Sequence, residues 1–428
     1  MKQIDVRATL ATASQAQRSG NHPEAARLCS LVLAQVGEHP LALNMLGMQA
    51  LARRHGDDAS NMFRRAIAAD PASPDLHMNL ASARRSIGDD AGERAALEGA
   101  LSIDQRHFMA LVRMAELLER QGDAARAAER WSGVLAMSVA IDDRSPALET
   151  MLDHARAFVA RQQEGLARAV DAGLETARAG VPVRDRRRFD ACIDHMLGRR
   201  QIYANNCAGL HVPFLPADEF FDREHFPWLA QIEAKTDVIR QELVNLLAAD
   251  AAALRPYVAM DPGTPENKWS PLDHKLDWGA FHLWKNGVRD DQACARCPQT
   301  AEAIEALPLA TLPARAPTIF FSLLQPGTHL PAHTGVSNVR AIIHLPLIVP
   351  EGCSFRVGGE TRIWQVGKAW AFDDTIEHEA WNRSDQLRAI LIFDVWNPYL
   401  SNAERELLQA FFPVADAGGY DLRTQIGD

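Results

Sequence analysis

The stretch HTGVSNVRAIIHLPL, residues 333–347, contains the strongest signals for the fold of the second half of this chain. Strict alternation places Arg340, Ile342 and His344 on one face of a predicted strand, with apolar residues between them. Turn residues such as Pro326-Gly327 and Gly358-Gly359 separate this strand from others. Short strands with such turns predict two packed sheets of the jelly-roll (double-stranded β-helix) kind. The predicted strands are 278–284, 318–324, 339–347, 354–357, 369–372 and 389–395, preceded by a helix over 228–247.

Two histidines and an arginine occur in order along this strand-rich region. His378 follows His333 after 45 residues, and Arg388 comes ten residues later. Two imidazoles suit Fe(II), and a guanidinium on a strand suits the distal carboxylate of a dicarboxylate co-substrate. Non-haem iron sites usually add a carboxylate, but the position two residues after His333 is Gly335. Ser322, on an earlier predicted strand, is placed to donate a hydrogen bond to a carboxylate held by Arg388.

Length and composition indicate an ordinary globular protein. The 428 residues predict two to three domains, with 47% hydrophobic and 23% charged residues. The net charge of −10 argues against nucleic acid or an anionic membrane surface as a partner. We find neither a signal sequence nor an apolar run near the roughly 18 residues of a membrane helix. Six cysteines are too sparse for a disulfide framework, so we expect a reducing, cytoplasmic location.

The first 140 residues contain a sequence repeat with a period of 34. Small residues recur at this spacing, as at Ala25, Ala59 and Ala127, and larger residues recur four positions later. This pattern is typical of helix-turn-helix units stacked into a solenoid and resembles the tetratricopeptide repeat. An unrelated bundle of amphipathic helices is the alternative. The predicted turns within the repeats are Gly20-Asn21, Gly56-Asp57, Gly88-Asp89 and Gly122-Asp123.

These patterns predict a multidomain α + β protein. Residues 1–140 form the repeats, and residues 141–205 continue as a helical cap or linker. Aromatic residues and prolines appear from about Cys207, so we place the second domain, with its jelly roll and flanking helices, at residues 206–428. Solenoid repeats present a concave surface for peptides, but repeat identity alone names no ligand.

The C-terminal half resembles the aspartyl/asparaginyl β-hydroxylase family. The resemblance rests on residues 333–347, on the segment that contains His378 and Arg388, and on residues 278–284. It also rests on the run Asp394-Val395-Trp396-Asn397-Pro398. It implies Fe(II), 2-oxoglutarate and O₂ as cofactor and co-substrates, with a hydroxylated product, succinate and CO₂. Family members hold iron with two histidines and no protein carboxylate, which fits Gly335. The resemblance also includes a tetratricopeptide segment ahead of the oxygenase domain in an animal member.

The resemblance implies roles for individual residues of this chain. His333 and His378 match the iron ligands, Ser322 and Arg388 match the pair that holds the distal carboxylate of 2-oxoglutarate, and His344 matches a residue near its other end. Water, or Asp374 in the outer sphere, would then complete the site.

One position departs from the family pattern. Many relatives carry arginine two residues before the histidine of the His-Leu-Pro-Leu run, where this chain has Ile342. Arg340, on the same face, is the candidate either to replace it or to bind a substrate carboxylate. Trp278 either lines the substrate cleft or packs in the core, and Asp373-Asp374 form either an acid/base pair or a turn before His378.

The sequence therefore predicts a dioxygenase that hydroxylates an sp³ carbon. The favoured substrate is the β-carbon of Asp or Asn in a peptide or protein gripped partly by the repeats. The alternatives are hydroxylation of a small-molecule, carrier-bound or lipid substrate, or a repeat scaffold whose barrel has lost catalysis. The sequence leaves the oligomeric state open.

Overall fold

The structure, a computed structural model, describes residues 4–419. It divides into two compact units, Met1–Arg188 and Phe189–Asp428. The first is built from helices, and the second contains all the strands of the described residues together with shorter helices.

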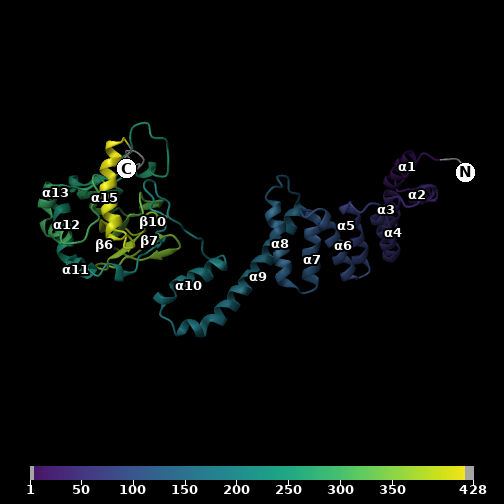
Figure 1. The fold of residues 1–428 in the computed structure, drawn as a ribbon, viewed down its shortest axis with the longest axis horizontal. Helices are drawn as coiled ribbons and strands as arrows, with labels where there is room; N and C mark the ends of the chain where they lie inside the picture. The colour runs from purple at the N-terminus through teal and green to yellow at the C-terminus, as the bar shows by residue number, and fades with distance from the viewer. Residues whose placement is uncertain (1–3, 420–428) are drawn as a thin grey trace. The chain divides into compact units, whose positions relative to one another are not determined.

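Eight helices of the first unit form four successive pairs, α1–α2 to α7–α8 (Figure 1). Each odd-numbered helix begins 34 residues after the previous odd-numbered one, and the even-numbered helices keep the same spacing. The repeat predicted from the sequence is thus confirmed. The helices are α1 Val6–Arg18, α2 His22–Val36, α3 Pro40–Ala52, α4 Gly56–Ala69, α5 Pro74–Ser86, α6 Asp90–Ile103, α7 Phe108–Arg120 and α8 Ala124–Ser138.

Small residues allow the paired helices to approach closely. The ring of Phe63 on α4 is fully buried against α3, where a side chain on Gly47 would lie 2.6 Å from the phenyl Cε1 atom. One predicted turn is wrong: Gly56 is the first residue of α4, and the turn before it uses Arg54 in a left-handed conformation (φ 63°). Gly56 is small because Ser86 and Ile87 pack against it.

Two helices follow the repeats. α9, Pro146–Ala179, packs on α8 and extends for 34 residues, and α10 is Val183–Met196. The division between the two units falls within α10. The domain boundaries drawn after residues 140 and 205 from the sequence stay predictions.

The second unit contains two antiparallel sheets. The larger has the strand order β1-β2-β4-β11-β6-β9, with β3 paired to β2, and the smaller has the order β5-β10-β7-β8. The strands are β1 Arg255–Pro256, β2 Trp278–Lys285, β3 Val288–Arg289, β4 Ile319–Leu324, β5 His329–His333, β6 Arg340–Ile348, β7 Cys353–Val357, β8 Glu360–Arg362, β9 Trp370–Phe372, β10 His378–Asn382 and β11 Arg388–Trp396. All six predicted strands are present, but β1, β3, β5, β8 and β10 were not predicted.

Helices cover one face of the larger sheet. Alternate residues of its central strands, such as Phe321, Ile343 and Leu391, form a buried cluster with apolar side chains of the helices. The single helix predicted over 228–247 is two helices that are interrupted at Ala234 and Lys235. The helices of this unit are α11 Leu229–Glu233, α12 Thr236–Ala249, α13 Asp291–Arg296, α14 Pro298–Glu305 and α15 Asn402–Ala417, with 3₁₀ turns at Arg223–His225, Ala251–Ala253 and Ser270–Leu272.

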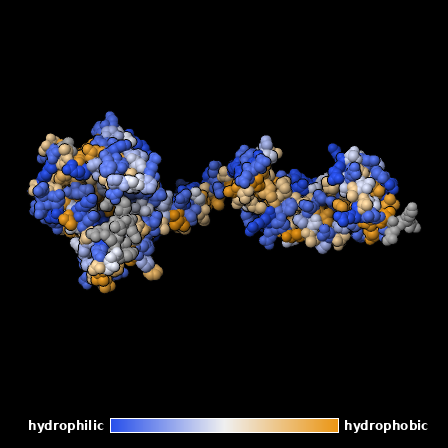
Figure 2. Space-filling view, turned by 90° about the horizontal axis from the view of Figure 1, so that it is seen from above, coloured by the Kyte–Doolittle hydropathy of each residue, from blue (hydrophilic) through white to orange (hydrophobic). Residues whose placement is uncertain are grey.

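The other face of the larger sheet and the smaller sheet enclose a second buried cluster. It includes Phe220, Leu330, Phe355 and Ile390 from both sheets and from the segment before α11. The visible surface of the protein is mostly hydrophilic, with scattered hydrophobic side chains (Figure 2). Across residues 4–419, no helix combines the length and the apolar character needed to cross a membrane.

Gly47 and Gly133 provide a matched test of the repeat packing. We expect Gly47→Ala to lower the free energy of unfolding of the helical unit by about 1–3 kcal/mol, because the new methyl group would overlap the buried Phe63 ring. Gly133→Ala in α8 has open space around it and should instead stabilise by about 0.5–1 kcal/mol. Urea unfolding followed by circular dichroism measures both. Equal effects of the two substitutions would contradict this account.

Candidate active site

A cavity of about 420 Å³ lies in the second unit, between the two sheets. One face of β6 lines it with Arg340, Ile342 and His344, as the alternation of the sequence predicts. The other strands of the larger sheet contribute Ser322 from β4 and Arg388 from β11, among others. All eight site residues predicted from the sequence line this cavity: Trp278, Ser322, His333, Arg340, His344, Asp374, His378 and Arg388.

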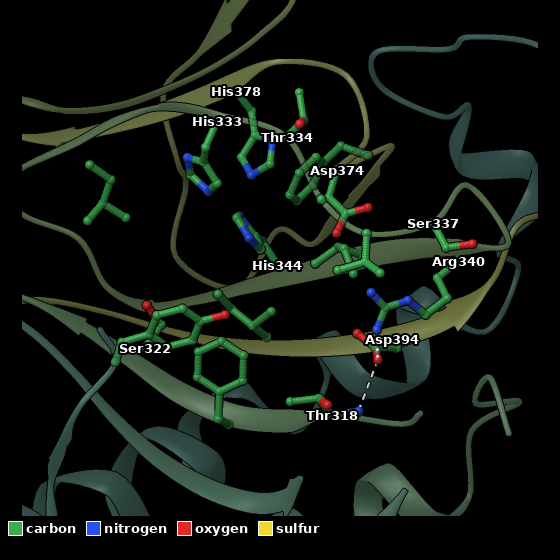
Figure 3. Close-up of a pocket in the computed structure, with 18 of the residues that line it drawn as sticks. Thr318, Ser322, His333, Thr334, Ser337, Arg340, His344, Asp374, His378 and Asp394 are labelled. Carbon is green, nitrogen blue, oxygen red and sulfur yellow. Dashed lines mark hydrogen bonds and ion pairs between the residues drawn. The ribbon is translucent and has the colours of Figure 1, made fainter. Parts of the chain in front are cut away.

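His333 and His378 face the same space from two neighbouring strands (Figure 3). β5 and β10 pair antiparallel with these two residues directly opposite each other, and their ring centroids are 4.0 Å apart. Opposed residues of an antiparallel pair project to the same side of the sheet, which explains why the rings meet. The register shifts between His378 and Ala380, immediately beside the pair.

The two imidazoles are arranged as neutral ligands. His333 Nδ1 donates to the carbonyl of Pro331 at 2.7 Å, and His378 Nδ1 donates to that of Ile376 at 3.0 Å. Each bond assigns the proton to Nδ1 and leaves Nε2 with a free lone pair, the usual arrangement of a metal-bound histidine. Burial lowers the pKa of His333 to about 4 and that of His378 well below its usual value. Both rings are therefore neutral at neutral pH.

Within residues 4–419, His333 and His378 stand without a third side chain of the kinds that bind metal. No group of three or more His, Cys, Asp or Glu residues is placed to hold a metal ion there. A side chain on Gly335 would lie 2.1 Å from Oδ2 of Asp374, so the Asp374 carboxyl fills the space where a side chain at position 335 would project. Oδ1 of Asp374 is buried without a hydrogen-bond partner, and burial raises the pKa of this carboxyl to about 7.

Arg388 lies at the deep end of the cavity and is 1% exposed. Its Nη1 donates to the carbonyl and the hydroxyl of Ser322, both at 3.3 Å, while its Nε has no partner. Among the described residues no carboxylate forms an ion pair with this guanidinium, and burial lowers its pKa to about 10. An unpaired buried cation is costly unless an anion joins it. This end of the cavity is thus suited to an anionic ligand.

Further polar atoms near Arg388 are also without partners. Nδ1 of His344 and Nε1 of Trp364 are buried and make no hydrogen bond. The Arg388 guanidinium carbon lies 5.1 Å from the centroid of the Trp364 ring, which lines the same cavity. Burial, followed by the Arg388 charge, lowers the pKa of His344 well below its usual value. These groups offer hydrogen bonds that the protein itself does not use.

Arg340 is paired inside the protein. Its Nη1 donates to Oδ2 of Asp394 at 2.8 Å, and the same oxygen accepts from the backbone N–H of Thr318 at 3.0 Å (Figure 3). The two side chains are 14% and 4% exposed. Arg340 therefore faces the cavity, as expected, but its charge is already compensated by Asp394. Ile342, between Arg340 and His344, adds only apolar surface.

One wall of the cavity is aromatic. Trp278 stacks on Tyr257 with ring centroids 3.8 Å apart and donates from Nε1 to the Ser322 hydroxyl at 3.1 Å. Phe320 continues this wall, 5.3 Å from Tyr257. Trp278 is 6% exposed and lines the cavity, so it packs in the core, while its contact with a substrate stays a prediction.

Several lining residues were missed from the sequence. The rings of Trp269 and His333 pack in a T-shaped arrangement with centroids 4.9 Å apart, and Trp364 contacts Arg388. Both occur in irregular segments, where periodicity carries no information about facing. The role of Asp394 was not predicted, because nothing in the sequence pairs it with Arg340, 54 residues away.

The comparisons with known proteins concern mainly the second unit. Residues 233–398 match the family model described as Aspartyl/Asparaginyl beta-hydroxylase. The human protein of that name is 42% identical over 140 residues, which are 32% of this chain and 18% of the relative. The ornithine lipid ester-linked acyl 2-hydroxylase of Rhizobium tropici is 37% identical over 187 residues, 43% of this chain and 62% of the relative. The chain thus spans less than two thirds of either relative.

A solved structure also matches part of the chain. A mutant of the Thermobaculum terrenum O-GlcNAc transferase is 27% identical with a TM-score of 0.28, over 31% of this chain and 25% of that one.

His282 stacks on Phe320 in the cavity wall. We expect its titration to make the free energy of unfolding depend on pH. Burial lowers its pKa from 6.5 to about 4 in the folded protein, so only the unfolded chain is protonated between these values. The free energy of unfolding should therefore rise with pH over this range. In His282→Phe, the slope of unfolding free energy against pH should fall by up to about 1.4 kcal/mol per pH unit, one proton's worth. Identical slopes for the two proteins would contradict the buried, neutral state of His282.

Proposed function

We infer that this chain, whose residues 233–398 belong to the aspartyl/asparaginyl β-hydroxylase family, is a hydroxylase that uses Fe(II), 2-oxoglutarate and O₂ to hydroxylate an sp³ carbon. The observation that carries the co-substrate is Arg388, a buried guanidinium with an unused Nε and no carboxylate partner in the described residues. The strand order supports a jelly roll, because the eight strands β4 to β11 are shared between the two packed sheets.

2-Oxoglutarate fits the free donors of the cavity. Its distal carboxylate would accept hydrogen bonds from Arg388 and from Ser322, whose hydroxyl already lies 3.3 Å from the guanidinium. A planar guanidinium pairs with carboxylate through two parallel bonds, which satisfies the free Nε. The keto-acid end would point toward His333 and His378, past His344.

Fe(II) fits the two histidines. Both present Nε2 to one space, and both are oriented by Nδ1 bonds to backbone carbonyls. Bound there, the metal would supply O₂ activation, and 2-oxoglutarate and water would provide the remaining ligands. Asp374, beside Gly335, would accept a hydrogen bond from such a water or, when protonated, donate one to it.

The protein's own contribution is to orient the reactants and exclude bulk water. His344 lies against Phe355 and Phe372, with ring centroids 4.9 and 4.7 Å away. These apolar rings keep solvent from the deep end of the cavity. The Arg340–Asp394 pair and the aromatic wall of Tyr257 and Trp278, which line the same cavity, would contact the substrate.

We propose the β-carbon of Asp or Asn in a peptide or protein as the target, with the repeats gripping part of the substrate. The name of the matched human relative supports this class. Arg340 offers no uncompensated charge to a substrate carboxylate, because Asp394 already pairs with it. We keep a cytoplasmic location as a proposal, which the six free cysteines support.

A lipid or other apolar substrate is the second candidate. The aromatic wall and Ile342 favour it, and the Rhizobium tropici relative is named for an acyl 2-hydroxylase. Mass spectrometry of a cell extract treated with the enzyme distinguishes the two, because the gain of one oxygen atom would appear either on a peptide or on a lipid. A scaffold without catalysis is disfavoured, since it would have no need for an uncompensated Arg388.

His378 and His329 test the metal site. We expect His378→Ala to weaken Fe(II) binding at least about 100-fold and to abolish conversion of 2-oxoglutarate to succinate, because one of only two protein ligands is lost. His329→Ala, on the exposed part of β5, removes an imidazole that stacks on Trp381 and should leave both unchanged. Anaerobic Fe(II) titration followed by absorption, and succinate assay, measure these effects. A wild-type protein that neither binds Fe(II) nor turns over 2-oxoglutarate would overturn the proposed function.

Arg388 and Arg383 test the co-substrate site. Arg388→Gln should raise the KM for 2-oxoglutarate at least about 30-fold, equivalent to about 2 kcal/mol, because it removes the buried partner of the distal carboxylate. The ligand-free variant should be no less stable than wild type, since Arg388 has no carboxylate partner to lose. Arg383→Gln removes an arginine that lies over Trp381 on the surface and serves as the control. A large loss of stability with unchanged KM would show that Arg388 is structural.

A further inference from the structure

An irregular segment, residues 203–212, bonds to the two loops that adjoin the paired histidines. We call it the strap; it contains neither helix nor strand. The first ligand loop, residues 334–339, follows β5 and His333, and the second, residues 373–377, leads into His378. The strap lies outside residues 233–398, the segment matched by the family model.

The strap bonds to the first ligand loop mainly through backbone groups. The N–H of Gly209 donates to the carbonyl of Val336 at 2.8 Å. Val212 and Asn338 exchange two bonds of 2.8 Å each, between the backbone of one and the side-chain amide of the other. Asn338 is fully buried. The loop after His333 is therefore held along its length.

The strap bonds to the second ligand loop through two consecutive asparagines. The backbone N–H of Asn206 donates to the carbonyl of Thr375 at 2.8 Å. The side-chain amide of Asn205 donates to Asp373 Oδ2 at 2.7 Å and to the Thr375 hydroxyl oxygen at 2.9 Å. Asp373 Oδ1 in turn accepts from the backbone N–H and hydroxyl of Thr375, at 3.0 and 2.6 Å. Asp373 and Thr375 are fully buried, so Asn205 completes a closed network.

We propose that Asn205, with Asp373 and Thr375, is a positioning cluster that fixes the loop leading into His378 for metal binding. In the usual two-histidine, one-carboxylate site, the carboxylate two residues after the first histidine attaches its loop to the metal. Gly335 has no such side chain. Its backbone is held instead, with its N–H bonded to the carbonyl of Asp374 at 2.5 Å and its carbonyl accepting from the strap N–H of Ala208 at 3.2 Å.

This arrangement explains how Asn205 would affect a metal that it does not touch. Groups that orient metal ligands without touching the metal typically change its affinity by about 10–100-fold when they are removed. Asn205 reaches neither histidine, so its effect passes through Asp373 and Thr375 to the loop that ends at His378. The metal role of this cluster rests on the proposed function, whereas its hold on the loop does not.

Hydrogen exchange of the metal-free full-length protein tests the hold on the loop that leads into His378. Asn205→Ala should raise amide exchange in residues 373–377 about tenfold, because it leaves the buried oxygens of Asp373 and Thr375 without a donor. Asn206→Ala is the matched control: its exposed side chain is removed while its backbone bond is kept. Exchange in β6 should be unchanged in both. Unchanged loop exchange in Asn205→Ala would overturn the proposal.

Co(II) titration in the presence of 2-oxoglutarate tests the effect on the metal. Asn205→Ala and Thr375→Val should each weaken Co(II) binding about tenfold or more, with an altered visible spectrum. Thr375→Ser keeps the hydroxyl and should restore wild-type affinity, which a loss of packing alone would not predict. Wild-type affinity in Asn205→Ala would refute the metal role even if loop exchange rises. Failure of the wild type to bind Co(II) would refute the proposed function and the metal role together.

Discussion

The antiparallel pairing of β5 with β10 is the constraint on which the site depends. It places His333 and His378 opposite each other, with their rings 4.0 Å apart. A slip by one residue would turn one histidine to the other face of the sheet, so the register itself determines whether the imidazoles meet. The shift in register next to His378 is the kind of local irregularity that re-aims a side chain at a functional site. The strap and both ligand loops hold the strand ends in this register.

Two arginines in one cavity show how charge is divided between structure and ligand. Arg340 is compensated by Asp394 at 2.8 Å, with Thr318 as a further donor to the same carboxylate. In the part of the chain that the structure describes, Arg388 donates hydrogen bonds to the oxygens of Ser322 and lies over the face of Trp364, with no carboxylate partner. Burying a cation without an anion destabilises the folded protein, and that cost is offset when a carboxylate enters. The cavity thus keeps one uncompensated buried cation at the expense of the stability of the ligand-free protein, and the proposed co-substrate would supply the missing anion.

The sequence was sufficient for those parts of the fold that repeat or alternate. A spacing of 34 residues predicted the helix pairs, and alternation on β6 predicted which side chains face the cavity. β5 and β10 were missed because HLPAH and HEAWN are short, rich in histidine and poor in β-branched residues. Two contacts could not be predicted from the sequence: the ion pair of Arg340 with Asp394 and the hydrogen bond of Asn205 to Asp373. Both join residues that are distant in sequence, and no sequence pattern encodes their proximity.

The surroundings of Gly335 involve two loops rather than one missing side chain. Any Cβ at position 335 would lie 2.1 Å from the Asp374 carboxyl, while the Gly335 N–H and carbonyl are both engaged by neighbouring segments. A side chain at position 335 would require the Asp374 carboxyl to move aside, within a loop that is tied to the strap through its buried residues Asp373 and Thr375. Gly335, Asp374 and the strap therefore form one arrangement. Under the proposed function, its hydrogen bonds between loops would do the positioning that a metal-bound carboxylate does elsewhere.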